Sequence, residues 1–217
     1  MTSDAILSCA ELSASYDGRQ VFCSVTFSLA SGVYALQGAN GIGKSTLLRL
    51  LAGAQAPDAG RVWINGVDLM EAAVEARKHL AYVPDECPVY PFMTGEEFLQ
   101  FVAALKRTRV DARVRELIVA FGLDEHMASR FDAMSLGTKK KMMLCAAWIG
   151  SPKVFLMDEP GNGLDLAARD HIIWLLRREG RENIIIFSAH DEDFVAATGA
   201  TLIDMRSLIT LRRAAAH

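Results

Sequence analysis

The chain has 217 residues, of which 51% are hydrophobic, so it is long enough for one domain with a substantial core. The formal net charge of −3 gives no electrostatic reason to expect nucleic acid or an anionic membrane surface as the main partner. No apolar run approaches the about 18 residues of a membrane span, and the first residues lack a signal segment, so we expect a cytosolic protein. The isolated cysteines indicate buried thiols in a reducing compartment; they are Cys9, Cys23, Cys87 and Cys145.

The first part of the chain is predicted to form antiparallel β-structure. Residues 5–16 and 21–29 have the composition of strands and are separated by Asp17-Gly18, a pair typical of hairpin turns. Apolar and polar residues alternate over 25–29, which predicts a sheet with one exposed face. Residues 61–64 and 67–69 flank Asn65-Gly66, a second hairpin signal.

Between these hairpins lies the most informative stretch, residues 33–53. An apolar run at 33–36 predicts a buried strand, and a leucine-rich segment that stops at Gly53 predicts a helix. The loop between them has the spacing G-x-x-x-x-G-K-S, in which glycines let backbone N–H groups and the helix start face an anion. Lys44 can reach the β- and γ-phosphates and Ser45 can ligate Mg²⁺. We therefore predict a site for a nucleoside triphosphate with Mg²⁺; the alternative is a glycine-rich turn with an exposed lysine.

The middle of the chain has a different character. Residues 80–83 predict a strand that ends at Pro84. Residues 94–97 have the sequence of a capping box before a helical apolar pattern, and Asp111 can cap a further helix that stops at Gly122. A third helix is predicted over 139–149. We interpret residues 87–150 as a helical insertion.

The α/β pattern returns at Lys153. Residues 154–157 and 183–187 predict buried strands of a parallel sheet, with a helix over 166–178 between them. Residues 201–204 and 208–211 predict two short terminal strands.

Three further groups of residues suggest chemistry at strand and helix ends. Asp158 and Glu159 follow a buried strand, where the first carboxylate suits Mg²⁺ and the second suits activation of water; the alternative is a solvated strand end. His190 follows the next strand and can contact a γ-phosphate or the attacking water, or else is structural. Ser135 and Gly137 open a helix and can bind an anion, but taken alone they favour the simpler interpretation of an ordinary serine cap.

Together these features resemble the ATP-binding domain of ABC transporters over essentially the whole chain. Residues 38–46 resemble the Walker A loop, 154–159 Walker B, 134–138 the signature and 162–165 the D-loop with Asp165, while His190 matches the H-loop. Tyr16, beside a predicted turn, matches the aromatic A-loop that stacks on a nucleobase; the alternative is packing against the sheet. The resemblance implies that the nucleotide contacts are Tyr16, Gly38, Ala39, Asn40, Gly41, Ile42, Gly43, Lys44, Ser45 and Thr46.

The fold that this resemblance implies is α/β. It is a P-loop NTPase (RecA-like) core with a mainly parallel sheet, an antiparallel β-subdomain and a helical insertion. The core comprises residues 1–86 and 151–217, and the helical subdomain comprises 87–150, within one ABC-type ATPase domain.

The chain departs from the family pattern at two places. The usual Leu-Ser-Gly-Gly-Gln signature reads Met-Ser-Leu-Gly-Thr at residues 134–138, and the Q-loop glutamine is Asp85. A carboxylate at that position should repel the γ-phosphate unless Mg²⁺ lies between them or the side chain turns away. Both changes resemble a sub-group of bacterial export-type subunits.

The resemblance also implies a mechanism. ATP is held between two domains, in a homodimer or a heterodimer with a similar subunit, so Ser135 and Gly137 of one domain complete the site of the other. Ser45 and Asp158 hold Mg²⁺, Glu159 is the catalytic base, and His190 stabilises the transition state.

The implied partner is a separate transmembrane permease at the inner face of the membrane, docked around residues 85–98. Residues 90–93, Tyr-Pro-Phe-Met, either contact that permease or pack inside the helical lobe. We expect an export ATPase. The alternatives are a weakly hydrolysing regulatory module, a soluble ABC ATPase of another process, and a P-loop kinase, which would leave Ser135 and His190 unexplained.

Overall fold

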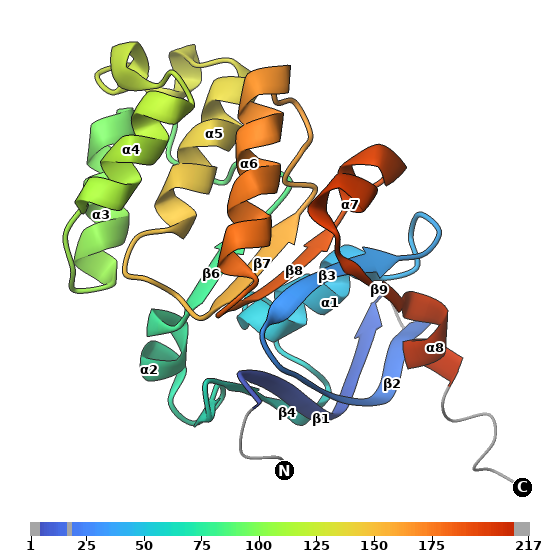
Figure 1. Cartoon of the computed structure of the whole chain (residues 1–217). Coiled ribbons are helices and arrows are strands. Elements are labelled where there is room, and N and C mark those ends of the chain that lie inside the picture. The colour runs from blue at the N-terminus through green and yellow to red at the C-terminus, as the bar shows by residue number, and fades with distance from the viewer. Residues whose placement is uncertain (1–4, 17–18, 211–217) are drawn as a thin grey trace, which may run out of the picture.

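A five-stranded parallel sheet lies at the centre of the molecule (Figure 1). The computed structural model describes residues 5–16 and 19–210, and within them the strand order is β6-β7-β8-β3-β9. The strand bounds are Gly32–Gln37 for β3, Leu80–Val83 for β6, Val154–Asp158 for β7, Ile184–Ser188 for β8 and Thr201–Asp204 for β9. All residues of β7 and β8 are buried, as a sheet covered on both faces requires.

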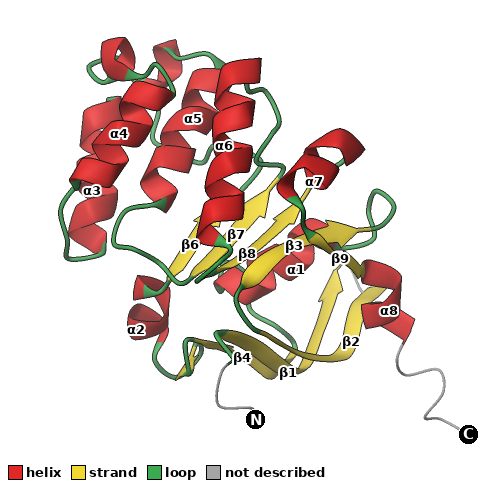
Figure 2. Cartoon of the chain, in the orientation of Figure 1, coloured by secondary structure: helices red, strands yellow, loops and turns green. Residues whose placement is uncertain are grey.

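Alternate residues of the parallel strands belong to two different cores. In β7, Phe155 and Met157 pack with the helices of one face, whereas Val154 and Leu156 pack with the leucines of α1 (Lys44–Ala52) on the other. Figure 2 shows α1 between the two sheets of the molecule and the larger helices on the opposite face. The period of two along each strand therefore assigns every second side chain to one core.

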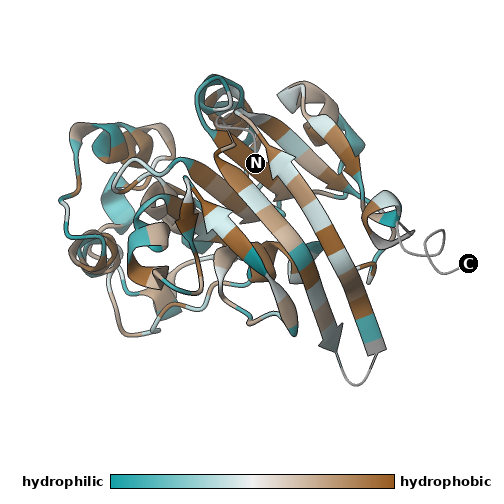
Figure 3. Ribbon diagram, turned by 90° about the horizontal axis from the view of Figure 1, so that it is seen from below, coloured by the Kyte–Doolittle hydropathy of each residue, from teal (hydrophilic) through white to brown (hydrophobic). Residues whose placement is uncertain are grey.

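The second sheet is antiparallel and has the order β2-β1-β4-β5. Its strands are β1 (Leu7–Tyr16), β2 (Arg19–Leu29), β4 (Ala59–Ile64) and β5 (Val67–Asp68). Figure 3 shows hydrophobic and hydrophilic residues alternating along its long strands, which confirms the prediction of one exposed face. Both predicted hairpin pairings are present, although the first turn, residues 17–18, lies outside the described residues.

The remaining helices cover the parallel sheet or extend beyond it. They are α2 (Ala73–Lys78), α3 (Gly95–Leu105), α4 (Ala112–Ala120), α5 (Leu136–Ala147), α6 (Leu166–Glu179), α7 (Glu192–Thr198) and α8 (Met205–Thr210), with short 3₁₀ turns at Asp124–His126 and Phe131–Ala133. Figure 1 shows α3, α4 and α5 gathered at one end of the molecule. The capping box is present, because Thr94 Oγ1 accepts from Glu97 N at 3.2 Å and Thr94 N donates to Glu97 Oε2 at 2.8 Å. No helix among the described residues has the length and apolar character to cross a bilayer.

The structure corrects the sequence prediction in three places. The strand predicted over 208–211 is wrong, because the described part of it lies in α8: Asp204 Oδ1 accepts from Arg206 N at 2.9 Å and starts a helical turn that buries Met205. The helix predicted from residue 139 begins earlier, at Leu136, because Ser135 caps it. Of the thiols predicted to be buried, Cys9 and Cys145 are buried and the other two are partly exposed.

Candidate functional site

An open cavity of about 330 Å³ lies at the C-terminal ends of β7 and β8, beside the start of α1. Parallel strands present their carboxyl ends at one edge of a sheet, so residues far apart in sequence meet there. The lining residues are Asn40, Gly41, Gly43, Lys44, Ser45, Thr46, Arg49, Asp85, Asp158, Glu159, Ser188 and His190. This list contains the predicted phosphate-binding, metal-binding and catalytic side chains together.

The loop before α1 needs glycine at Gly43. Its φ of 109° is one that side-chain-bearing residues rarely adopt, and a Cβ there would lie 2.8 Å from Val21 Cγ1 and 2.9 Å from the ring of Phe22. Strand β2 of the antiparallel sheet therefore supports the loop from behind. The conformation that the loop adopts depends on both the glycine and this contact.

Lys44 is buried, and its ammonium group is held by the loop itself. Its Nζ donates to the carbonyl oxygen of Gly38 at 2.8 Å and to that of Ala39 at 3.4 Å. Among the described residues no side chain caps the start of α1, so the first N–H groups of the helix remain available to an anion. The loop, the ammonium group and the helix start together suit a polyphosphate.

Asp158 is buried at the end of β7 and is fixed by a neighbouring strand. Ser188 Oγ donates to Asp158 Oδ1 at 2.5 Å and accepts from Glu159 N at 3.1 Å. Mg²⁺ in nucleotide sites is usually held by one or two protein oxygens, with phosphate oxygens and water completing the octahedron. Ser45 and Asp158 supply such oxygens to one open cavity, so this donor set fits Mg²⁺.

Glu159 and His190 contact each other at the same cavity. Glu159 Oε1 lies 3.3 Å from His190 Nε2, and the backbone N of His190 donates to Glu159 Oε2 at 3.3 Å. Burial raises the pKa of Glu159, and His190 acts in the opposite direction. Glu159 has a φ of 50°, a strained conformation that costs about 1 kcal/mol, and such strain is often found where a side chain is held for function. A carboxylate with a raised pKa beside an imidazole can accept a proton from water.

Asp85 lines the cavity, and Lys140 is paired with it. Lys140 Nζ lies 3.5 Å from Asp85 Oδ1 and donates to the carbonyl oxygens of Asp158 at 2.9 Å and of Pro84 at 3.2 Å. Neither Lys140 nor Ser188 was predicted from the sequence to belong to the site. The available signal was an acidic residue at position 85 that required a cation, but three consecutive lysines at 139–141 could supply it.

Seven predicted site residues are not among those that line this cavity. Three of them, Gly38, Ala39 and Ile42, belong to the phosphate loop itself, and the other four lie on other segments. Tyr16 is exposed at the end of β1. Ser135 Oγ caps α5 by accepting from Thr138 N at 3.1 Å, and a Cβ on Gly137 would lie 2.6 Å from the carbonyl oxygen of Gly163. Asp165 caps α6 and pairs with Lys141, which lowers the pKa of that carboxyl. The signature and D-loop segments thus pack against each other, away from the phosphate loop of the same chain.

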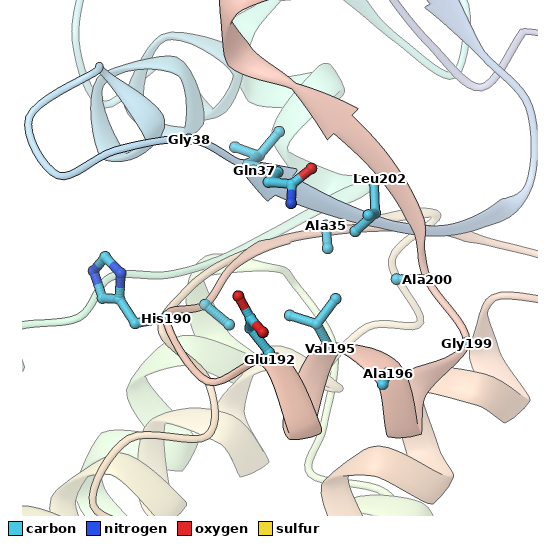
Figure 4. A pocket seen from close by; sticks show the side chains of 12 residues that line it. Ala35, Gln37, Gly38, His190, Glu192, Val195, Ala196, Gly199, Ala200 and Leu202 are labelled. Atoms are coloured by element: carbon cyan, nitrogen blue, oxygen red, sulfur yellow. The ribbon is translucent and has the colours of Figure 1, made fainter.

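A second cavity of about 460 Å³ lies on the other side of His190, between α7 and strands β3 and β9. Figure 4 shows Gln37 and Glu192 on opposite walls of this cavity and His190 at its edge. Small apolar residues form most of the lining, and no Lys or Arg is among the described residues that line it. A polyphosphate would find no cation there, so the smaller cavity is the candidate nucleotide site.

The chain is similar in sequence and in fold to known proteins. Residues 23–162 match the family model described as "ABC transporter". The ABC transporter ATP-binding protein NatA of Bacillus subtilis is 31% identical over 182 residues, which are 81% of this chain and 73% of that protein. The Nod factor export ATP-binding protein I of Rhizobium etli is 33% identical over 186 residues, which are 83% of this chain and 58% of that protein.

A solved structure of an ATP-binding subunit of an ABC transporter has a TM-score of 0.83 at 26% identity and covers 92% of this chain and 86% of its own. The chain spans only part of some relatives that it matches. It covers 61% of the linearmycin resistance ATP-binding protein LnrL of Bacillus subtilis and 10% of the human phospholipid-transporting ATPase ABCA3.

Proposed function

Because this chain belongs to the family of ABC transporter ATP-binding proteins, whose members are ATPases, we propose that it binds ATP with Mg²⁺, hydrolyses it, and drives a separate membrane permease in export. The observation that carries the proposal is the convergence of Lys44, Asp158 and Glu159 on one cavity. These three side chains come from the phosphate loop and the end of β7, and each has the contacts that its role needs.

The side chains have separate tasks in hydrolysis. Lys44 and the N–H groups at the start of α1 bind the phosphates, and Ser45 and Asp158 hold Mg²⁺, which offsets the phosphate charge. Glu159 accepts a proton from the attacking water, and its contact with His190 orients it. Tyr16, exposed at the end of β1, is proposed to stack on the adenine base.

The site is proposed to be completed by a second domain. Ser135 and Gly137 lie outside the cavity of their own chain, beside the D-loop. Leu136 and Leu166, the first residues of α5 and α6, are 82% and 80% exposed. Such apolar exposure on two adjacent segments supports an interface with another copy or a similar subunit, and Asp165 of the D-loop belongs to it.

The proposed permease contact is supported by two aromatic side chains before α3. Tyr90 and Phe92 are 60% and 63% exposed and stack on each other with ring centroids 5.5 Å apart. The alternative of packing inside the helical lobe is therefore wrong for these two residues, whereas Met93 does pack against that core. Docked in this way, the chain would be peripheral at the cytoplasmic face of the membrane. Export is favoured because relatives are named for Nod factor export and for linearmycin resistance.

The test uses the purified chain and its Glu159→Gln variant. We expect the variant to bind ATP with Mg²⁺ but to lose at least 100-fold in hydrolysis, since it cannot accept the proton, and to elute as an ATP-dependent dimer. Glu182→Gln makes the same change on an exposed side chain before β8, far from the cavity, and should behave as wild type. If Glu159→Gln keeps wild-type turnover, Glu159 is not the base.

Two further outcomes separate the alternatives. A wild-type chain that binds ATP but stays inactive, even with a detergent-solubilised permease, would be a regulatory module. Hydrolysis that no permease stimulates would favour a soluble ABC ATPase of another process.

A further inference from the structure

Lys140 is a buried cation that the proposed mechanism does not use. Only 5% of its surface is exposed, although it lies on α5, next to two lysines that are less buried. Its ammonium group is bound by the carbonyl oxygen of Asp158 at 2.9 Å and that of Pro84 at 3.2 Å. These carbonyl groups belong to the metal-binding strand end and to the segment that carries Asp85, so one side chain joins α5 to both.

The charges around the cavity explain why a cation is needed there. Among the described residues that line the cavity are three carboxylates, those of Asp85, Asp158 and Glu159, and two cations, Lys44 and Arg49. The Asp85 side chain is 53% exposed, so a polyphosphate that enters this cavity meets its carboxylate. In the described part of the chain, that carboxylate has an ion-pair contact with Lys140. An unpaired carboxylate at that place would repel the phosphates.

Burial lowers the pKa of Lys140, and the carboxylates of Asp85, Asp158 and Glu159 act in the opposite direction. The ammonium form is thus supported from the side of the nucleotide cavity. Two carbonyl oxygens also fix the position of Nζ beside the exposed Asp85 side chain.

We propose that Lys140 is a positioning residue for the nucleotide site, which holds the carboxylate of Asp85 at the cavity and cancels its charge toward the polyphosphate. The two side chains act as one neutral unit contributed by α5 and by the segment after β6. This inference rests on the proposed function, because its ligand is ATP. It implies that the Asp85 carboxylate is paired with Lys140 and therefore does not repel the phosphates.

The test is a double-mutant cycle in metal-free binding of a fluorescent ATP analogue, MANT-ATP, in EDTA. Lys140→Met should weaken binding about tenfold, the scale expected for two unit charges about 12 Å apart at an effective dielectric constant of about 20. Lys140→Met/Asp85→Asn should return to within about threefold of wild type, since no unpaired carboxylate remains. Lys139→Met, the same substitution one position earlier, is the matched control and should bind as wild type.

The comparison between the two Lys140→Met chains isolates the carboxylate, because both have lost the same bonds to Pro84 and Asp158. Equal weakening in both chains would overturn the inference and leave Lys140 as a structural support. Failure of the wild-type chain to bind MANT-ATP would overturn the proposed function together with the inference, whereas equal weakening overturns the inference alone.

Asp85→Asn by itself gives a second test that does not depend on the folding of Lys140→Met. Asp85 is largely exposed, so this variant should fold, and it leaves the charge of Lys140 unbalanced beside the phosphates. We expect MANT-ATP binding to tighten about threefold at low salt and the gain to disappear near 0.5 M salt, where about 4 Å of screening length remains. Unchanged or weakened binding at low salt would contradict the proposal.

Discussion

Removal of the Ser188 hydroxyl group should disturb the metal edge of the site through its hydrogen bond to Asp158. Ser188 is buried at the end of β8, and its Oγ donates to the Asp158 carboxylate at 2.5 Å. A hydrogen bond to a charged group contributes about 2 kcal/mol. Glu159 N keeps the carbonyl oxygen of Ser188 as an acceptor at 3.2 Å, so Ser188→Ala should cost little more than this one bond.

Two measurements follow from that magnitude. With a urea dependence of about 2 kcal/mol per molar, the unfolding midpoint of Ser188→Ala should fall by about 1 M. Because the freed carboxylate of Asp158 can rotate, the Mg²⁺ concentration for half-maximal ATP hydrolysis should rise about tenfold, as is typical when the group that orients a metal ligand is lost.

Thr198→Val is the matched control for this experiment. It removes a buried hydroxyl group that donates to Val195 O at 2.7 Å in α7, away from the cavity. We expect a loss of about 1 kcal/mol in unfolding free energy and no change in the Mg²⁺ requirement. A wild-type urea midpoint for Ser188→Ala, or a Mg²⁺ requirement no higher than that of Thr198→Val, would refute the role assigned to the Ser188 hydroxyl group.

Three further predictions concern packing and charge outside the nucleotide cavity of the same chain. Burial lowers the pKa of Lys106 from 10.5 to about 8, so the folded chain loses this proton at lower pH than the unfolded chain does. The unfolding free energy of the wild type, relative to that of Lys106→Met, should therefore rise by up to about 3 kcal/mol between pH 8 and 10.5. Urea titration at several pH values measures this rise. Lys153→Met, which removes an exposed lysine, is the matched control for the loss of a positive charge. Gly137→Ala should lower the free energy of unfolding by about 1–3 kcal/mol, because the added Cβ would lie 2.6 Å from Gly163 O. An unchanged midpoint of urea unfolding would contradict that contact. Thr94→Ala removes the cap of α3 and should lower the free energy of unfolding by about 1 kcal/mol, while the affinity for MANT-ATP stays unchanged. A loss of affinity would show that α3 does more than support the helical lobe.

Much of the fold was accessible from the sequence because its signals are local. The hairpin turns, the capping box at Thr94 and the run from a buried strand through glycines to Lys44 each depend on residues a few positions apart. Helices α2 and α7 were not predicted. Both are short, and α2 has no side chain at its cap among the described residues, so contacts with the sheets stabilise it more than its own sequence does.

At residues 208–211 the local sequence signal predicted the wrong structure. Residues 208–211 have the composition of a strand, yet the described part of them continues the helix that starts at Met205. Met205 is completely buried in the core between the sheets. Burial of that side chain, together with the bond from Arg206 N to Asp204, outweighs the β-propensity of a short apolar run.

The sequence alone determined the phosphate loop, the acidic strand end and the histidine that follows β8, because each motif has its meaning in the spacing of consecutive residues. The tertiary structure decided which residues support them. Ser188 reaches Asp158 across 30 positions of the chain, and Lys140 reaches the Pro84 carbonyl across 56. Three consecutive lysines are nearly equivalent in a sequence, but on a helix they point about 100° apart. Only the packing of α5 against the end of β7 shows that the middle one lies below the nucleotide cavity, beside the carboxylate of Asp85.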